Sequence, residues 1–155
     1  SQRSFDVHGV VTVQEEVGHR GAYVCECKVC PDLTISLDMD FATDVPNGLK
    51  SKYGEIALGR GVIIHRSIDN DIPTTYALEK LAKKLNIKHQ VSARNIPVGG
   101  TNTFILQQSH GGNRVISLGI PCRYMHTPVE LCNLDDINAT IDLLYNVITS
   151  PKLIE

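Results

Sequence analysis

The sequence lacks the features that mark several classes of protein. None of its apolar stretches approaches the roughly 20 residues that a transmembrane helix needs, so we expect no membrane partner. Its first residues contain no apolar core of the kind found in secretory signal peptides, and we therefore expect no secretion signal. Low-complexity segments and internal repeats are also absent.

Neither sign of charge predominates. Fifteen Lys and Arg residues stand against 17 Asp and Glu residues, for a net charge of −2. This balance gives no electrostatic reason to expect nucleic acid as a partner. With 42% apolar and 21% charged residues, the composition is that of a globular domain. A single domain of 155 residues buries enough surface to be stable without a disulfide or a structural metal.

The five cysteines form no obvious framework. Their odd number, without a secretion signal, favours reduced thiols and a cytoplasmic setting. Three of them, Cys25, Cys27 and Cys30, lack the second Cys-x-x-Cys or histidine pair of structural zinc sites. Cys122 and Cys132 are distant from these three in sequence, although the fold could bring them near. We expect partly buried free cysteines rather than a thiolate metal site.

Hydrophobic patterning predicts strands alternating with helices. The strands are expected at 5–13, 32–38, 62–64, 88–93 and 114–119. The helices are expected to begin near Pro73, after the 99–101 turn and at Asn133, with a further short helix possible within 18–29. The segment 43–61 should be mainly loop, because Gly and Pro punctuate it. This alternation predicts a layered α/β fold with a mostly parallel sheet.

Reactive side chains follow three of the predicted strands. Glu15 and Glu16 come at the end of the first, Asp38 ends the second, and His126 follows the strand at 114–119 through a short loop. Ligands bind beyond the carboxyl ends of parallel strands, so these residues could converge at one edge of the sheet. Two carboxylates and an imidazole suit zinc, cobalt or manganese, and the remaining glutamate could act as general base. From spacing alone, ordinary roles at the surface and in turns remain open for all four.

Four motifs occur in order along nearly the whole chain. Val13–Ala22 closely resembles the glutamate motif of the glutamyl and tetrahedral aminopeptidases, which are dinuclear metallopeptidases. Leu37–Pro46 is similar to the aspartate strand and Gly-Asp-Thr-Pro loop of that family. Gly99–Asn102 resembles its Gly-Gly-Thr-Asp turn, and Pro121–Glu130 is similar to its histidine motif.

The resemblance implies a three-layer α/β sandwich of the phosphorylase/hydrolase type and a hydrolase that removes N-terminal residues from peptides. It implies that Glu15 is the general base, that Glu16 and His126 hold one metal ion, and that Asp38 holds the other. Two zinc or cobalt ions are implied for the complete site. Assembly into a homo-oligomer is also implied.

The sequence departs from this family in what it lacks. The family also uses a histidine from an upstream His-x-Asp motif and an aspartate that bridges both metals, and no His-x-Asp string occurs here. We therefore expect residues 1–155 to be the C-terminal half of a catalytic domain, incomplete and without the separate dimerisation domain. A split gene with a complementing N-terminal half, a truncated enzyme and an inactive remnant that binds a partner chain or peptide all remain open.

Two smaller features bear on the site. Asn102 stands where the family turn has aspartate, and we expect it to shape the turn, since Asn and Asp share turn-forming habits. His19 lies three residues after Glu16 and is kept as a reserve candidate. The other histidines, His8, His65, His89 and His110, are expected to be surface residues or satisfied core residues.

Overall fold

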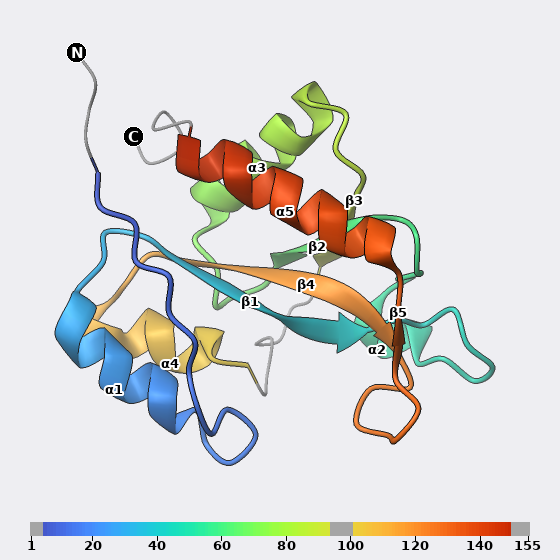
Figure 1. The fold of residues 1–155 in the computed structure, drawn as a ribbon, viewed down its shortest axis with the longest axis horizontal. Coiled ribbons are helices and arrows are strands. Elements are labelled where there is room, and N and C mark those ends of the chain that lie inside the picture. Colours follow the sequence, from blue (N-terminus) through green and yellow to red (C-terminus); the bar gives the residue numbers. More distant parts are fainter. Residues whose placement is uncertain (1–4, 94–100, 150–155) are drawn as a thin grey trace.

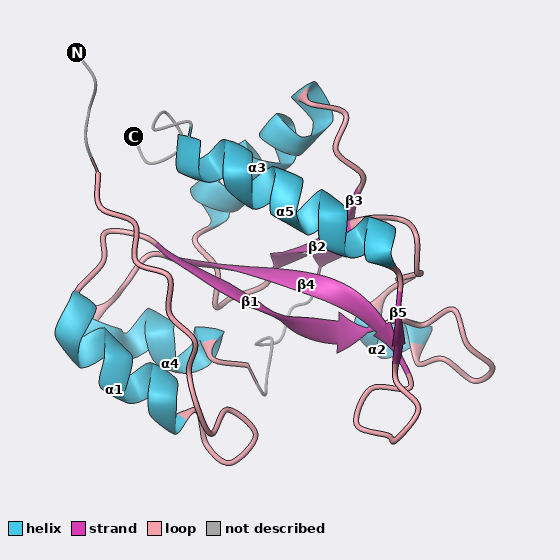
Figure 2. Ribbon diagram, in the orientation of Figure 1, coloured by secondary structure: helices cyan, strands magenta, loops and turns pink. Residues whose placement is uncertain are grey.

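The computed structural model describes residues 5–93 and 101–149. Its strands are β1 (Thr34–Phe41), β2 (Val62–Arg66), β3 (His89–Ala93), β4 (Val115–Arg123) and β5 (Leu131–Cys132). Its helices are α1 (Arg20–Val29), α2 (Lys50–Tyr53), α3 (Ile72–Lys84), α4 (Thr103–Gln108), the 3₁₀ turn η1 (Ser109–Gly111) and α5 (Leu134–Thr149). Figure 1 and Figure 2 show α3 and α5 on one face of the sheet and α1 and α4 on the other. The expected layered α/β architecture is confirmed.

The sheet is mixed rather than mostly parallel. Its strand order is β1-β4-β2-β3, and β5 adds to the end of β4. The β1–β4 and β2–β3 pairs are parallel, whereas β2 and β5 each run antiparallel to β4. The expectation that all strand ends share one edge therefore holds only within each parallel pair.

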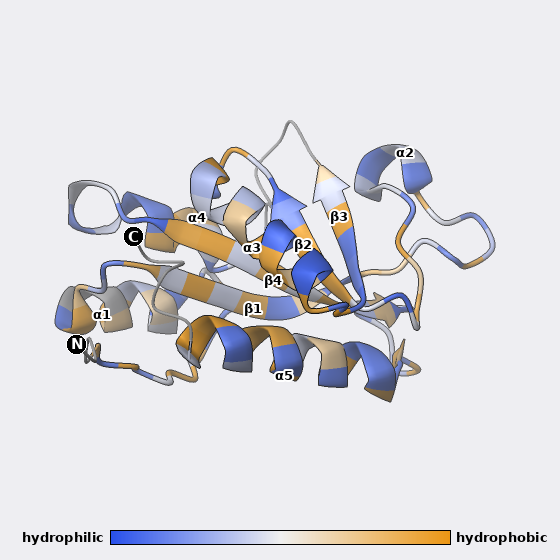
Figure 3. Cartoon of the chain, turned by 90° about the horizontal axis from the view of Figure 1, so that it is seen from above, coloured by the Kyte–Doolittle hydropathy of each residue, from blue (hydrophilic) through white to orange (hydrophobic). Residues whose placement is uncertain are grey.

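The core forms around the central strands. Alternate residues of β2 and β4 face α3 and α5, where Ile64, Leu118 and Leu143 are fully buried in one cluster. On the other face, Ala22 of α1 and Leu106 of α4 pack against Val115. Figure 3 shows the apolar residues concentrated along β4. Within the described residues, no helix has both the length and the apolar character needed to cross a membrane.

The strand expected at 5–13 is absent. This segment pairs with none of the described strands, and its valines Val7, Val10, Val11 and Val13 are between 50% and 97% exposed. Val13 makes one backbone hydrogen bond, accepting from Gly21 N at 3.0 Å. The β-branched residues give the segment strand propensity, but a strand also needs a neighbour for its backbone groups. That neighbour is not found in the described part of the chain.

Other expectations agree more closely. The helix at Pro73 starts at Ile72, and its cap Asp71 accepts a hydrogen bond from Thr74 N at 3.0 Å. The strand expected at 114–119 continues to Arg123 because β5 pairs with its last two residues. Of the expected glycine turn, Gly99 and Gly100 lie outside the described residues, and α4 follows from Thr103.

Two aspartates hold the long loop between β1 and β2. Asp44 pairs with Arg123 through two bonds of 2.9 and 2.6 Å and accepts a third from Leu58 N. Asp136, in the first turn of α5, is fully buried and accepts from Gly59 N at 2.8 Å and Gly61 N at 2.6 Å. At the same helix start, the Asn133 side chain accepts a hydrogen bond from Asp135 N, so the helix begins directly after Asn133, as expected.

We predict that Asp136→Ala lowers the free energy of unfolding by about 3 kcal/mol, because it leaves two backbone N–H groups without their charged acceptor. Urea denaturation would measure this. The matched control is Asp135→Ala, which removes an exposed carboxylate from the same helical turn and should change stability by less than about 0.5 kcal/mol. Equal effects of the two substitutions would contradict this role of Asp136.

We predict that the Asp44 contact makes stability depend on pH. Hydrogen bonds from Arg123 hold the pKa of Asp44 below its ordinary value of 3.8, despite an opposing effect of burial. Its contribution is therefore present above pH 3.8 and lost as the pH falls through the folded-state pKa. Asp44→Asn should be less stable than the wild type near neutral pH. The difference in their free energies of unfolding, measured by urea denaturation, should narrow as the pH falls below 3.8. Asp142→Asn, which removes an exposed carboxylate, is the matched control and should change stability by less than about 0.5 kcal/mol near neutral pH.

Candidate active site

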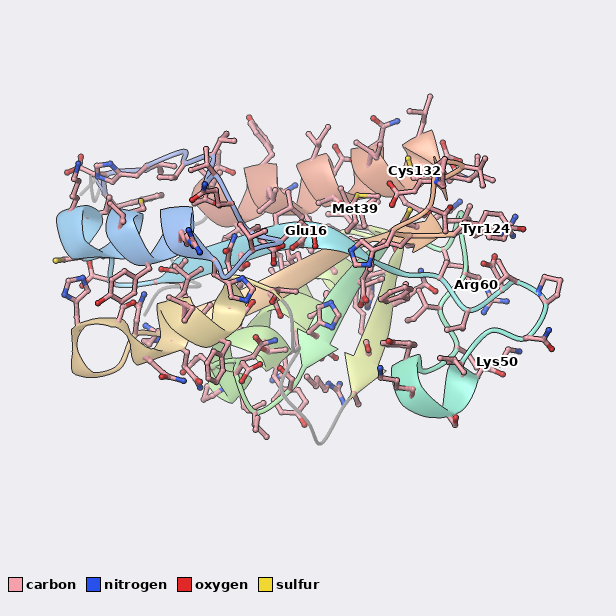
Figure 4. The ribbon with its side chains drawn as sticks, turned by 90° about the horizontal axis from the view of Figure 1, so that it is seen from below. Glu16, Met39, Lys50, Arg60, Tyr124 and Cys132 are labelled. Atoms are coloured by element: carbon pink, nitrogen blue, oxygen red, sulfur yellow. The ribbon has the colours of Figure 1, made fainter. Side chains whose placement is uncertain are left out.

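The four predicted site residues come from three separate segments that the fold brings together. Glu15 and Glu16 lie in the turn before α1, Asp38 lies within β1, and His126 lies in the loop between β4 and β5. Glu16 Oε1 is 3.3 Å from His126 Nε2. Figure 4 labels Glu16 and Met39, the β1 residue that follows Asp38. Of the four predicted residues, the structure thus brings Glu16 and His126 into contact, whereas Glu15 and Glu16 follow no strand and Asp38 is not at a strand end.

Glu15 is the less exposed of the two glutamates. Its Oε1 lies 3.2 Å from His19 Nδ1, and the backbone turns tightly here, since Gly18 N and His19 N both donate to Glu15 O. Burial raises the pKa of Glu15 above its ordinary value, and the negative charge of Asp38 raises it further, while His19 opposes the shift. His19, only a reserve candidate in the sequence, is therefore the direct neighbour of the candidate base.

Asp38 sits in the middle of β1, opposite Gly119 of β4. Its Oδ1 accepts a hydrogen bond from Met39 N at 2.8 Å. Burial raises the pKa of Asp38, and the negative charges of Glu16 and Asp40 add to the shift, against the lowering effect of the Met39 N–H. The site thus concentrates carboxylates that repel one another, which is the environment that a bound cation relieves.

The donor types fit divalent metal ions, but the ligand set is partial. The described residues contain no group of three or more His, Cys, Asp and Glu side chains arranged around one ion. Instead, Glu16 and His126 form one close pair, and Asp38 stands apart from it as a third donor. The described residues gather fewer donors than two ions need. They therefore fit part of a larger site.

A buried histidine–aspartate pair that was not predicted from the sequence lies beside the site. His65 Nε2 of β2 is 3.2 Å from Asp40 Oδ2 of β1, and the two residues are only 2% and 6% exposed. They meet across β4 at Gly119, where an added methyl group would lie 3.0 Å from Asp40 Cβ and 3.0 Å from His65 Nε2. The period-2 spacing of Asp38 and Asp40 was the available signal, because it places both carboxylates on one face of a strand.

The loop that carries His126 is tightly shaped. His126 and Tyr124 both have positive φ, of 65° and 58°. The Glu130 carboxylate accepts a hydrogen bond from His126 N at 2.6 Å, and the Phe41 ring meets the His126 ring edge-on, with centroids 5.9 Å apart. Phe41 in turn stacks on Tyr53 at 4.8 Å. The end of β1 therefore helps to position the imidazole.

Asn102 lies at the start of α4, where its backbone carbonyl accepts from Ile105 N and Leu106 N. Its side-chain amide donates to Thr12 Oγ1 at 3.1 Å. Asn102 thus ties α4 to the segment that leads into Glu15. A role in shaping the structure remains our interpretation of this residue.

The sequence profile of the M42 glutamyl aminopeptidase family matches residues 1–143. The chain belongs to this family. A lysyl aminopeptidase of Pyrococcus furiosus is 34% identical to it over 138 residues, which cover 89% of this chain and 39% of the relative. The family resemblance read from the sequence motifs is thereby confirmed.

Solved structures of aminopeptidases share the fold of this M42 chain. An aminopeptidase from Desulfurococcus kamchatkensis matches it with a TM-score of 0.83 and 29% identity over 93% of this chain and 42% of that one. A TET aminopeptidase from a marine sediment Thaumarchaeota archaeon matches with a TM-score of 0.83 and 28% identity, over 92% and 40%. The M42 chain thus spans about two fifths of the length of these relatives.

We predict that Gly119→Ala destabilises the M42 chain by about 1–3 kcal/mol, because the added methyl group overpacks strand-anchored atoms of Asp40, His65 and Ile63. Thermal or urea unfolding would measure the loss. Gly9→Ala is the matched control, since a methyl group there meets nothing within 4 Å. If Gly119→Ala were as stable as Gly9→Ala, the inference that the Asp40–His65 pair packs closely over Gly119 would be contradicted.

Proposed function

We propose that this M42 chain is the part of an aminopeptidase that carries the general base and three metal ligands. It would remove N-terminal residues from peptides once the remaining ligands are supplied. The observation that carries the proposal is the 3.3 Å approach of Glu16 to His126 from two separate segments, with Asp38 close enough for its charge to raise the pKa of Glu15, in a member of the M42 family.

The roles of the metal ligands are those that the family resemblance implies, and the close Glu16–His126 pair supports them. Glu16 and His126, 3.3 Å apart, would hold one divalent ion, and Asp38 would hold the other. Zinc and cobalt are the ions we propose. When bound, such ions polarise a carbonyl oxygen and lower the pKa of water.

Glu15 suits the task of a general base. A base works best when its pKa lies nearer the working pH than that of an ordinary carboxylate, and burial together with Asp38 shifts the pKa of Glu15 in that direction. Its partial burial limits competition from bulk water. His19, whose Nδ1 lies 3.2 Å from Glu15 Oε1, would help to position the carboxylate.

The chain would need a partner to complete the site. It lacks the family's His-x-Asp motif and spans about two fifths of its relatives. Among the described strands β1 pairs only with β4, which leaves one backbone edge of β1 open, and the valines of segment 5–13 are exposed. Such edges and apolar surfaces favour association. We propose a complementing N-terminal half, or a homo-oligomer that supplies equivalent residues.

A second candidate is an inactive subunit that binds a peptide or a partner chain. The partial ligand set favours it, because the described residues contain no group of three or more His, Cys, Asp and Glu side chains around one position. The two candidates differ in whether Glu15 is required for turnover.

We predict that the chain hydrolyses an N-terminal residue from peptides in the presence of zinc or cobalt and of a polypeptide that supplies the missing N-terminal half. Glu15→Gln should lower kcat by roughly 100-fold or more, the usual contribution of a general base. The assay measures amino acid release from a peptide with a free N-terminus, beside the same peptide acetylated.

Glu55→Gln is the control, since Glu55 is exposed and its carboxylate pairs with Lys50 Nζ at 3.4 Å. It should retain wild-type turnover. Failure of the assembled protein to turn over with either metal, or equal turnover by Glu15→Gln, would reject the enzymatic role and favour the inactive subunit.

A further inference from the structure

Two cysteines face each other at the base of the loop that carries His126. Cys122 of β4 and Cys132 of β5 are direct partners in the antiparallel pair, next to the Arg123–Leu131 pair. Both are free thiols in the structure. The two cysteines are separated in sequence, and their pairing depends on the short hairpin between them.

The backbone geometry of such a pair suits a disulfide. Directly opposed residues of antiparallel strands have Cα atoms about 4.5–5.5 Å apart, which is inside the range of about 4.4–6.8 Å found across disulfides. Opposed side chains also project from the same face of the sheet. A bond between these two sulfurs therefore needs side-chain rotation but no change of strand pairing.

The two thiols differ in exposure. Cys132 is exposed and is labelled in Figure 4, whereas Cys122 is only 1% exposed and its Sγ donates to Arg123 O at 3.4 Å. Burial raises the pKa of Cys122, and the charge of Glu130 raises it further. An external reagent would thus meet Cys132 first, and Cys122 would act second from its protected position.

We propose that Cys122 and Cys132 form a redox modification site, which a small-molecule disulfide such as oxidised glutathione converts to a cross-strand disulfide. The Cys132 thiolate attacks the reagent, forming a mixed disulfide and releasing one glutathione thiol. The Cys122 thiolate then attacks Cys132 Sγ, forming the protein disulfide and releasing the second glutathione thiol. The two cysteine sulfurs lose two electrons to the reagent, and their two protons end on the released thiols.

The disulfide would close the loop 123–131, which contains His126 and its positive-φ neighbour Tyr124. Cross-linking two residues at the base of a short loop restricts the unfolded chain and fixes the loop ends. This site exists whether or not the chain is an aminopeptidase, because it rests only on the β4–β5 pairing.

The test exposes the folded chain to oxidised glutathione, blocks remaining thiols and maps the peptides by mass spectrometry. We expect a Cys122–Cys132 linked peptide that has lost the mass of two hydrogen atoms, and a rise in the thermal midpoint of roughly 5 °C or more that a reductant reverses. In urea, the effective concentration of one thiol relative to the other should fall by about tenfold or more, because the paired strands no longer keep the two cysteines together.

Variants separate the steps. Cys132→Ser, at an exposed position, should abolish the linked peptide. Cys122→Ser should retain glutathione on Cys132, because the resolving thiol is gone. Cys30→Ser is the control: Cys30 is also exposed but directly follows α1, with its Sγ 3.4 Å from His110 Nε2, and its loss should leave the Cys122–Cys132 link unchanged.

Two results would overturn the proposal. One is a wild-type chain that keeps stable glutathione on Cys132 while Cys122 stays reduced. The other is a Cys122–Cys132 link that forms no more readily in the folded chain than in urea. Both can be read from the wild-type protein, so neither depends on how well the variants fold.

Discussion

The parallel pairing of β1 with β4 is the constraint on which the rest of this structure depends. It joins eight residue pairs from Thr34–Val115 to Phe41–Cys122 and places Asp38 opposite Gly119. Because side chains alternate along a strand, a slip of one residue would turn Asp38 and Asp40 to the opposite face. It would also separate Phe41 from the His126 ring that it contacts. The register therefore fixes the backbone, the candidate ligands and the shape of the histidine loop together.

The face of the sheet that carries Asp38 and Asp40 holds several charged side chains, and this lowers the stability of the fold. Asp38 and Asp40 project from β1, His65 reaches towards them across Gly119, and Glu15 and Glu16 approach from the turn before α1. Burial and mutual repulsion raise the pKa values of Glu15 and Asp38, so the ionised cluster is less favourable in the fold than in water. The other face, packed against α3 and α5, is apolar and supplies the compensating burial. Such a division is typical of proteins that hold a functional site on a rigid sheet.

The valine-rich segment before Glu15 does not form the strand that its composition favours. Its residues have the composition of a buried strand, yet they are exposed and pair with none of the described strands. The chain spans about two fifths of its aminopeptidase relatives, and the sequence lacks the His-x-Asp motif of the family. The unpaired strand propensity and the small number of ligands both agree with a chain that matches only part of the length of its relatives.

Local signals in the sequence determined much of this protein. Strand runs such as Val62–Ile64, the Asp71–Pro73 helix start and the ordered motifs were enough to predict the layered α/β fold and the M42 family. Only the tertiary structure decided what depends on distant partners. It left 5–13 without a partner among the described strands, made Asp136 an anchor of the loop before β2, joined Asp40 to His65 over Gly119 and set Cys122 opposite Cys132. Propensity and capping act over a few residues, whereas strand pairing and side-chain neighbours are set by contacts across the whole chain.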